Sequence, residues 1–254
     1  MKIRTVTPRY WVGLALMSAA VGGMAQAQTA PEAATAVVQT EGGEGGEAGA
    51  VAGVDAPTAY VVRIAIVEGH LDAAANLYAK GMVDEAIGLS YHPEAEMMDD
   101  VRAGLAANGA ADFSPQMQAF SSVMEAGGDP ATALAAFKDA ATAAMGAPDA
   151  KMRFTVALAV LRAAAAEYAG SIEGGAVVDV MAYHEAEAFV GVARDLLTPL
   201  VADADLGTLA GRAQSAMDPA AAAFGRDGTA FAANDPAILL AVAARVELLS
   251  SQVR

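Results

Sequence analysis

The sequence has no cysteine, one tryptophan and only three histidines among its 254 residues. The absence of cysteine excludes disulfides, thiolate metal sites, iron–sulfur clusters and c-type haem attachment, as well as thiol nucleophiles. Three histidines leave little for a hydrolytic triad. A fold without disulfides must be stabilised by its hydrophobic core, and a chain of this length can bury enough apolar surface to form one.

Positive charge is also scarce, with 15 Lys and Arg residues against 30 Asp and Glu residues and a net charge of −15. Nucleic acids and anionic lipids bind to clusters of basic side chains, so this composition predicts no nucleic-acid partner. An acidic surface is compatible with solubility, with a basic partner or with the attraction of cations.

The one long apolar run lies near the start of the chain. Three basic residues within the first nine precede an apolar stretch from Tyr10 to Gly23, and the tripeptide Ala-Gln-Ala that ends at Ala27 fits a signal-peptide cleavage site. The run is shorter than the ~20 residues that span a bilayer comfortably. We expect a signal peptide over residues 1–27, a periplasmic location and no membrane span in the mature form. The alternative is an uncleaved N-terminal anchor.

The segment from 28 to 55 contains the stretch TEGGEGGEAGAVAG. Glycine disfavours helix, and the regularly spaced glutamates repel one another, so this composition predicts a flexible acidic linker. No predicted strand precedes it and no Gly-Lys-Ser/Thr follows, which excludes a nucleotide-binding loop.

From Ala56 onward the sequence indicates consecutive helices. In the first, apolar residues recur at spacings of four and three from Tyr60 to Tyr78, the pattern of a helix face. No sustained strand alternation and no hairpin signal was identified, so the predicted fold class is all-α. Further helices are expected over residues 82–89, 93–107, 115–126, 130–144, 149–170, 177–202, 206–217 and 236–254.

Two similar segments lie ninety-two residues apart. The stretch YHPEAEMMDDVRAGL begins at Tyr91, and YHEAEAFVGVARDLL begins at Tyr183. The preceding long helices also align, with Arg and Tyr at matching positions. The pattern predicts one helical domain over residues 56–254, a bundle of two degenerate four-helix-type repeats at about 56–145 and about 149–254.

The histidines of these segments are each followed by a carboxylate at helical spacing. His184 and Glu187 are three residues apart, and His92 and Glu96 are four apart, which places each pair on one helix face. Imidazole with carboxylate suits zinc, iron, manganese or copper better than calcium or magnesium. His70 is the expected further ligand. Additional candidates are Glu68, Glu94, Glu185, Tyr91 and Tyr183.

The segment AYHEAE, from Ala182 to Glu187, resembles the G-x-H-x-x-E motif of the imelysin family. That family consists of exported all-helical proteins with duplicated bundles, is associated with iron uptake and was once classed with metallopeptidases. The resemblance implies that His184 and Glu187 bind metal. Two features depart from the family: Ala182 stands where the motif has glycine, and the chain is short.

These patterns predict a periplasmic, non-catalytic metal-binding protein that handles iron or haem. Iron is the first choice of metal, with zinc or copper as alternatives, and a periplasmic or membrane protein is a conceivable partner. A metallopeptidase is the third and weakest interpretation, because the zinc-binding motif His-Glu-x-x-His is absent and no general base is identifiable beside His184. The alternative function is a helical interaction or scaffold module without a ligand. The metal-binding prediction requires His70, His92 and His184 to converge to within about one coordination sphere, and histidines on separate faces would favour the scaffold.

Overall fold

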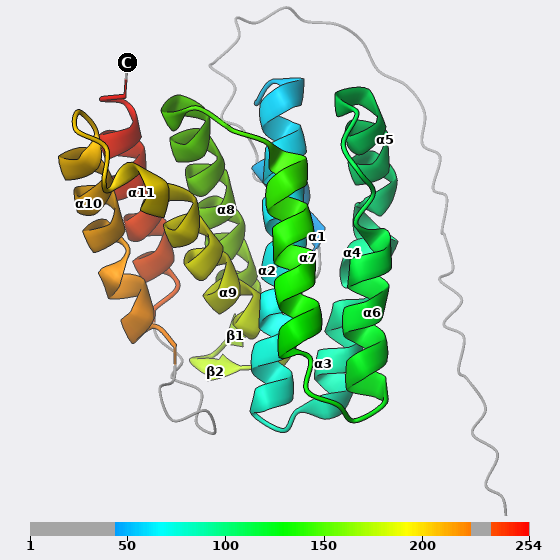
Figure 1. The fold of residues 1–254 in the computed structure, drawn as a ribbon. Coiled ribbons are helices and arrows are strands. Elements are labelled where there is room, and N and C mark those ends of the chain that lie inside the picture. Colours follow the sequence, from blue (N-terminus) through cyan, green and yellow to red (C-terminus); the bar gives the residue numbers. More distant parts are fainter. Residues whose placement is uncertain (1–43, 225–234, 254) are drawn as a thin grey trace, which may run out of the picture. The chain divides into compact units, whose positions relative to one another are not determined.

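The computed structural model describes residues 44–224 and 235–253, all within one compact unit that spans residues 39–254. The all-α prediction is confirmed, since the described residues form helices apart from one two-stranded hairpin (Figure 1). The predicted signal peptide lies outside the described residues. None of the described helices has the length and apolar character needed to cross a bilayer. The first elements are α1 (Glu44–Ala50), α2 (Ala56–Ala79), α3 (Val83–Ser90), α4 (His92–Glu96), α5 (Met98–Asn108), α6 (Ser114–Glu125) and α7 (Ala131–Met145). The remaining elements are α8 (Ala150–Gly170), β1 (Ile172–Glu173), β2 (Ala176–Val177), α9 (Val180–Leu197), η1 (Thr198–Leu200), α10 (Gly207–Ala216), η2 (Asp218–Ala222) and α11 (Ala237–Ser250).

Helix α2 is the central helix. It begins at Asp55, whose side chain accepts a hydrogen bond from the backbone N–H of Thr58 at 2.9 Å, and it ends before Gly81, which has a positive φ of 81°. Its buried residues occupy most of its circumference, because α3, α7, α8 and α9 all pack against it. His70, in the middle of α2, therefore lies in the interior.

Helices α8 and α9 form the most extensive helix pair, and the β1–β2 hairpin connects them (Figure 1). Gly174 and Gly175 make the turn with positive φ values of 58° and 82°. The sequence-based prediction did not include this hairpin, although a Gly-Gly pair is a recognised hairpin signal. Helix α9 then begins at Asp179, which caps the N–H of Ala182 at 3.1 Å. The tight return places α9 alongside both α8 and α2.

The predicted linker is wrong in its later part, because Glu44–Ala50 forms α1, which packs against α8. The glycines allow close helix contact: a Cβ atom at Gly46 would lie 2.7 Å from Glu167 Oε1 and 2.9 Å from Ala166 Cβ. This packing buries Glu47. The earlier part of the predicted linker, 28–43, lies outside the described residues.

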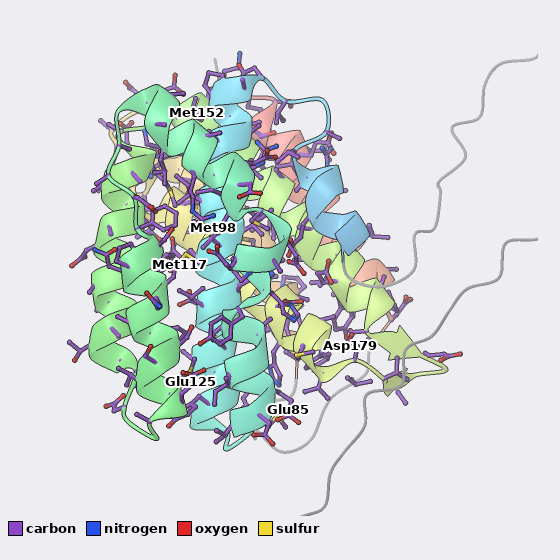
Figure 2. All side chains as sticks on the ribbon, turned by 90° about the vertical axis from the view of Figure 1, so that its right-hand side faces the viewer. Glu85, Met98, Met117, Glu125, Met152 and Asp179 are labelled. Carbon is purple, nitrogen blue, oxygen red and sulfur yellow. The ribbon has the colours of Figure 1, made fainter. Side chains whose placement is uncertain are left out.

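The single helix expected over residues 93–107 is also wrong, because it is two helices. Met97, with a φ of −141°, interrupts the helix between α4 and α5. The methionines that follow fill the core: Met98 and Met117 are buried between helices, whereas Glu85, Glu125 and Asp179 lie on the surface (Figure 2).

Candidate metal centre

The candidate site is centred on His70, in the middle of α2, whose side chain is 1% exposed. Its Nδ1 donates a hydrogen bond to the carbonyl oxygen of Ile66 at 2.9 Å, which directs Nε2 toward the neighbouring helices. Three carboxylate oxygens surround Nε2: Glu47 Oε1 at 3.0 Å, Glu185 Oε1 at 3.4 Å and Glu96 Oε2 at 3.5 Å. The carboxylates come from α1, α9 and α4, so the site joins four helices.

His92, on α4, lies beside this group. Its ring centroid is 6.2 Å from that of His70. His92 Nδ1 lies 3.5 Å from Glu185 Oε1 and 3.8 Å from Glu96 Oε1, and its side chain is 35% exposed. Two triads of potential ligand atoms result, one formed by His70, His92 and Glu185 and the other by Glu47, His70 and Glu96. We call these five residues the His70 cluster.

Helix α9 approaches α2 closely enough for Glu185 to reach His70 because residue 69 is glycine. A Cβ atom at Gly69 would lie 2.2 Å from Cδ1 of Phe189, one helical turn after Glu185. The Phe189 ring also packs against His70, with centroids 5.6 Å apart. Gly69 thus permits the helix contact that completes the cluster.

The carboxylates of the cluster favour the protonated forms of its two imidazoles. Burial disfavours the charged form of His70, but the charge and hydrogen bond of Glu47 outweigh it and raise the pKa of His70 well above its ordinary value. The carboxylate of Glu185, close to the ring of His92, raises the pKa of His92 despite partial burial. Imidazolium groups thus balance the carboxylates, and a metal ion would displace their protons.

Glu167, on α8, adds a further buried carboxyl group. Burial, reinforced by the charges of Glu185 and Glu47, raises the pKa of Glu167 to about 9. Glu167 Oε1 and Glu185 Oε1 are buried without a hydrogen-bond partner, although Glu185 Oε1 lies near both imidazoles of the cluster. Those two contacts are therefore electrostatic approaches without good hydrogen-bond geometry. Buried acceptors of this kind can be satisfied by a proton or by a cation.

The distances from His70 Nε2 to its three carboxylate neighbours fit the spacing of ligands around one ion. With metal–ligand bonds of about 2.1 Å, neighbouring ligands lie about 3.0 Å apart in an octahedron and about 3.4 Å apart in a tetrahedron. The distances from His70 Nε2 to Glu47, Glu185 and Glu96 run from 3.0 to 3.5 Å. The residues present can therefore hold an ion with small side-chain adjustments.

His184 and Glu187 form a separate group on α9. His184 Nδ1 lies 3.0 Å from Glu187 Oε2, and Lys80 Nζ lies 3.4 Å from the same oxygen and 3.3 Å from the same nitrogen. Neither residue belongs to the His70 cluster, so the expected convergence of all three histidines occurs for His70 and His92 only. The physical reason is the step of about 100° between successive helical residues, which turns Glu185 toward His70 and His184 elsewhere.

Of the predicted ligands, the structure brings His70, His92 and Glu96 together and adds Glu185, which was among the additional candidates. Glu47 was missed because its glycine-rich surroundings indicated a linker. Glu167 was missed too, although a lone carboxylate within the apolar run AAAAEYAG is a recognisable signal. The other candidates have different partners: Glu68 pairs with Lys138, Glu94 with Arg102, Tyr91 donates to Glu125 and Tyr183 to the carbonyl oxygen of Ala223.

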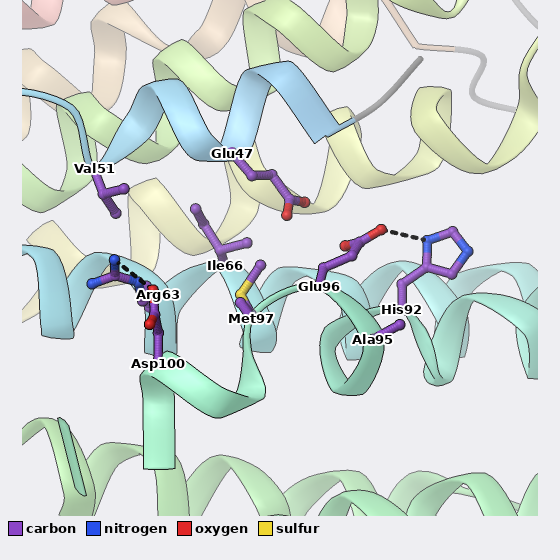
Figure 3. A pocket seen from close by; sticks show the side chains of 9 residues that line it. All are labelled: Glu47, Val51, Arg63, Ile66, His92, Ala95, Glu96, Met97 and Asp100. Atoms are coloured by element: carbon purple, nitrogen blue, oxygen red, sulfur yellow. Dashed lines mark ion pairs between the residues drawn. The ribbon is translucent and has the colours of Figure 1, made fainter. Parts of the chain in front are cut away.

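A cavity of about 710 Å³ opens beside the cluster (Figure 3). One part of its wall is formed by Glu47, His92 and Glu96, and another by the ion pair between Arg63 and Asp100. Apolar side chains line the wall between these polar groups. The cavity gives the candidate site a route to solvent.

Comparison with models of protein families found no match, and neither did searches against curated proteins or solved structures. The resemblance to the imelysin family therefore stays a prediction based on the AYHEAE segment.

Proposed function

We propose that this chain is an exported, non-catalytic metal-binding protein that handles iron, with the ion held in the His70 cluster. One observation carries the proposal: two triads of histidine and carboxylate groups, which share the buried His70 and come from four helices, each bring their ligand atoms within 4.8 Å of one another. Isolated surface carboxylates do not converge in this way. The group formed by His184, Glu187 and Lys80 offers only two metal-ligating side chains, and its third member is a cation.

The donor set favours iron among the transition metals. Imidazole nitrogen suits iron, zinc, copper and nickel, whereas carboxylate oxygen suits harder ions. Each triad combines imidazole nitrogen with carboxylate oxygen, and the three carboxylates of the cluster supply three negative charges, which can neutralise a ferric ion. The same carboxylates make the site better suited to an ion than to haem, whose propionates they would repel.

The two-repeat architecture belongs to this proposal. In support of it, Tyr78 at the end of α2 and Tyr168 at the end of α8, which occupy matching positions, both donate to backbone carbonyl oxygens, those of Met124 and Ala223. On this proposal the two Tyr-His segments have diverged. The first segment supplies His92 to the cluster. The second supplies Glu185, whereas its histidine, His184, contacts Glu187 and Lys80 instead.

The test is a Co²⁺ titration of the purified chain, followed by visible absorbance and by metal content after dialysis. We expect one ion per chain and an affinity at least tenfold lower in His92→Gln, a partly exposed position at which substitution leaves the core intact. His70→Gln should have a larger effect, and its fold is checked by circular dichroism. The matched control is His184→Gln, which should bind Co²⁺ like the wild type.

Iron specificity is tested in the same way with anaerobic Fe²⁺ against Zn²⁺, Mn²⁺ and Cu²⁺. A ligand that binds only the folded chain raises the unfolding free energy by about 2.7 kcal/mol at a hundredfold excess over Kd. A loss of binding in His184→Gln with full binding in His92→Gln would contradict the site. If the chain binds none of these ions, the metal-binding function is wrong and the helical scaffold module becomes the favoured function.

A further inference from the structure

The cavity beside the His70 cluster is far larger than an ion requires. Its volume of about 710 Å³ falls in the range of sites for small organic molecules. Its wall has two polar regions: Glu47, His92 and Glu96 form one, and the guanidinium of Arg63 contributes to the other. Figure 3 shows Arg63 apart from His92 and Glu96, with Ile66 and Met97 between them.

Arg63 and His70 are both on α2, seven residues apart. Seven residues make nearly two helical turns, so the two side chains leave the same face of the helix about 10.5 Å apart along its axis. Arg63 is partly exposed and pairs with Asp100 at 2.9 Å, whereas Asp100 itself is 67% exposed. A guanidinium has five N–H donors, so one carboxylate does not exhaust its capacity.

We propose that the metal ion is bound together with a small organic dicarboxylate or tricarboxylate, which coordinates the ion through one carboxylate and binds Arg63 through another. This inference rests on the proposed function. Neither triad of the His70 cluster fills the coordination sphere of an ion by itself, and Glu47, His92 and Glu96 line the cavity, so open coordination positions face it. The carboxylate of the co-ligand fills one of these positions, and its carbon chain packs against Ile66 and Met97.

Two carboxylates on one carbon chain define the class of co-ligand. One carboxylate coordinates the ion and the other binds the guanidinium of Arg63, while the apolar wall of Ile66 and Met97 between the two polar regions contacts the carbon chain. A monocarboxylate such as acetate has one such group and cannot bind both ends.

Asp100 competes with the co-ligand for Arg63. Substitutions of the two residues should therefore change co-ligand affinity in opposite directions. Arg63→Gln removes the guanidinium that binds the carboxylate, whereas Asp100→Asn leaves that guanidinium free to bind it. Both residues form a partly exposed pair, whose loss costs little stability. Arg162, which pairs with Glu247 at 2.9 Å on another part of the surface, is the matched control.

The experiment is a Co²⁺ titration of the full chain, alone, with millimolar succinate and with millimolar acetate, followed by the visible absorbance of the ion. We expect succinate to raise the Co²⁺ affinity about tenfold or more and to change the absorbance band, and acetate to do neither. The succinate effect should disappear in Arg63→Gln, increase in Asp100→Asn and persist in Arg162→Gln. Co²⁺ binding without succinate should be the same in Arg162→Gln as in the wild type, and in each variant the succinate effect is measured as the ratio of the Co²⁺ affinities with and without succinate.

The outcomes separate this inference from the function on which it rests. Co²⁺ binding that is indifferent to succinate, or a succinate effect that survives in Arg63→Gln, would overturn the co-ligand and leave the metal site in place. A failure of Co²⁺ to bind with or without succinate would overturn both. An equal effect of acetate would show a carboxylate bound to the ion without contact to Arg63, and would also overturn the inference.

Discussion

Replacing the buried Glu167 by glutamine should stabilise the metal-free protein, and increasingly so as the pH rises. In the folded chain, burial and the neighbouring carboxylates raise the pKa of Glu167 from 4.5 to about 9. The unfolded chain loses this proton above about pH 4.5, whereas the folded chain keeps it until about pH 9. The folded state therefore binds more protons across this window, and the contribution of Glu167 to stability falls as the pH rises through it.

The two pKa values give the size of the effect. Each unit of difference corresponds to about 1.36 kcal/mol, so between pH 5 and pH 8 this group destabilises the wild type by about 4 kcal/mol. Glutamine is nearly isosteric and does not titrate. The stability of Glu167→Gln relative to the wild type should thus rise by about 4 kcal/mol over the same range, whatever the cost of burying its amide.

The assay is urea unfolding of both proteins at pH 5 and pH 8 in the presence of a metal chelator. The unfolding free energies are compared only where the two proteins have equal m-values. The control is Glu173→Gln, an exposed position on β1, which should show no such pH-dependent gain. A stability difference between Glu167→Gln and the wild type that stays constant from pH 5 to pH 8 would refute the reasoning.

Two further substitutions test the packing around the site. Gly69→Ala should destabilise the fold by about 1–3 kcal/mol and lower the Co²⁺ affinity, because the new Cβ would overlap the ring of Phe189 and displace α9. Gly88→Ala is the control and should be neutral or stabilising, because there is open space around its Cβ. Equal unfolding free energies for the two variants would contradict this prediction. Tyr60→Phe should cost about 1 kcal/mol in chemical denaturation, because the hydroxyl donates at 2.9 Å to a buried backbone carbonyl oxygen at the end of α7. Tyr91→Phe, whose hydrogen bond is exposed, should cost measurably less, and the reverse order would contradict the assignment.

Helix positions were predictable where local signals agree. The caps at Asp55 and Asp149 and the apolar periodicity of α2 and α8 specify long helices from the sequence alone. The break at Met97 was not predictable, because the residues around it are ordinary helix formers. The β1–β2 hairpin was predictable in principle from Gly174-Gly175, but two-residue strands carry no alternation pattern.

The candidate site was predictable only in part, because its geometry depends on how helices pack. Spacing on one helix identifies His92 and Glu96 as neighbours and also His184 and Glu187, but cannot say which pair meets His70. The choice depends on the rotation of α9 about its axis, which is fixed by the contact between Gly69 and Phe189 across two helices. Glu47 depends on the docking of a glycine-rich segment onto α8, a tertiary contact with no local signature.

The most direct test of the metal centre is a crystal structure of the full chain soaked with Co²⁺ or Fe²⁺, with anomalous diffraction recorded at the absorption edge of the metal. Our account predicts one strong anomalous peak about 2.1 Å from Nε2 of His70 and within bonding distance of carboxylate oxygens of Glu47, Glu96 or Glu185. A peak between His184 and Glu187, with Lys80 displaced, would contradict it and support the imelysin-type prediction instead. The absence of any peak from a crystal that diffracts well would favour a helical scaffold whose histidines only pack and pair.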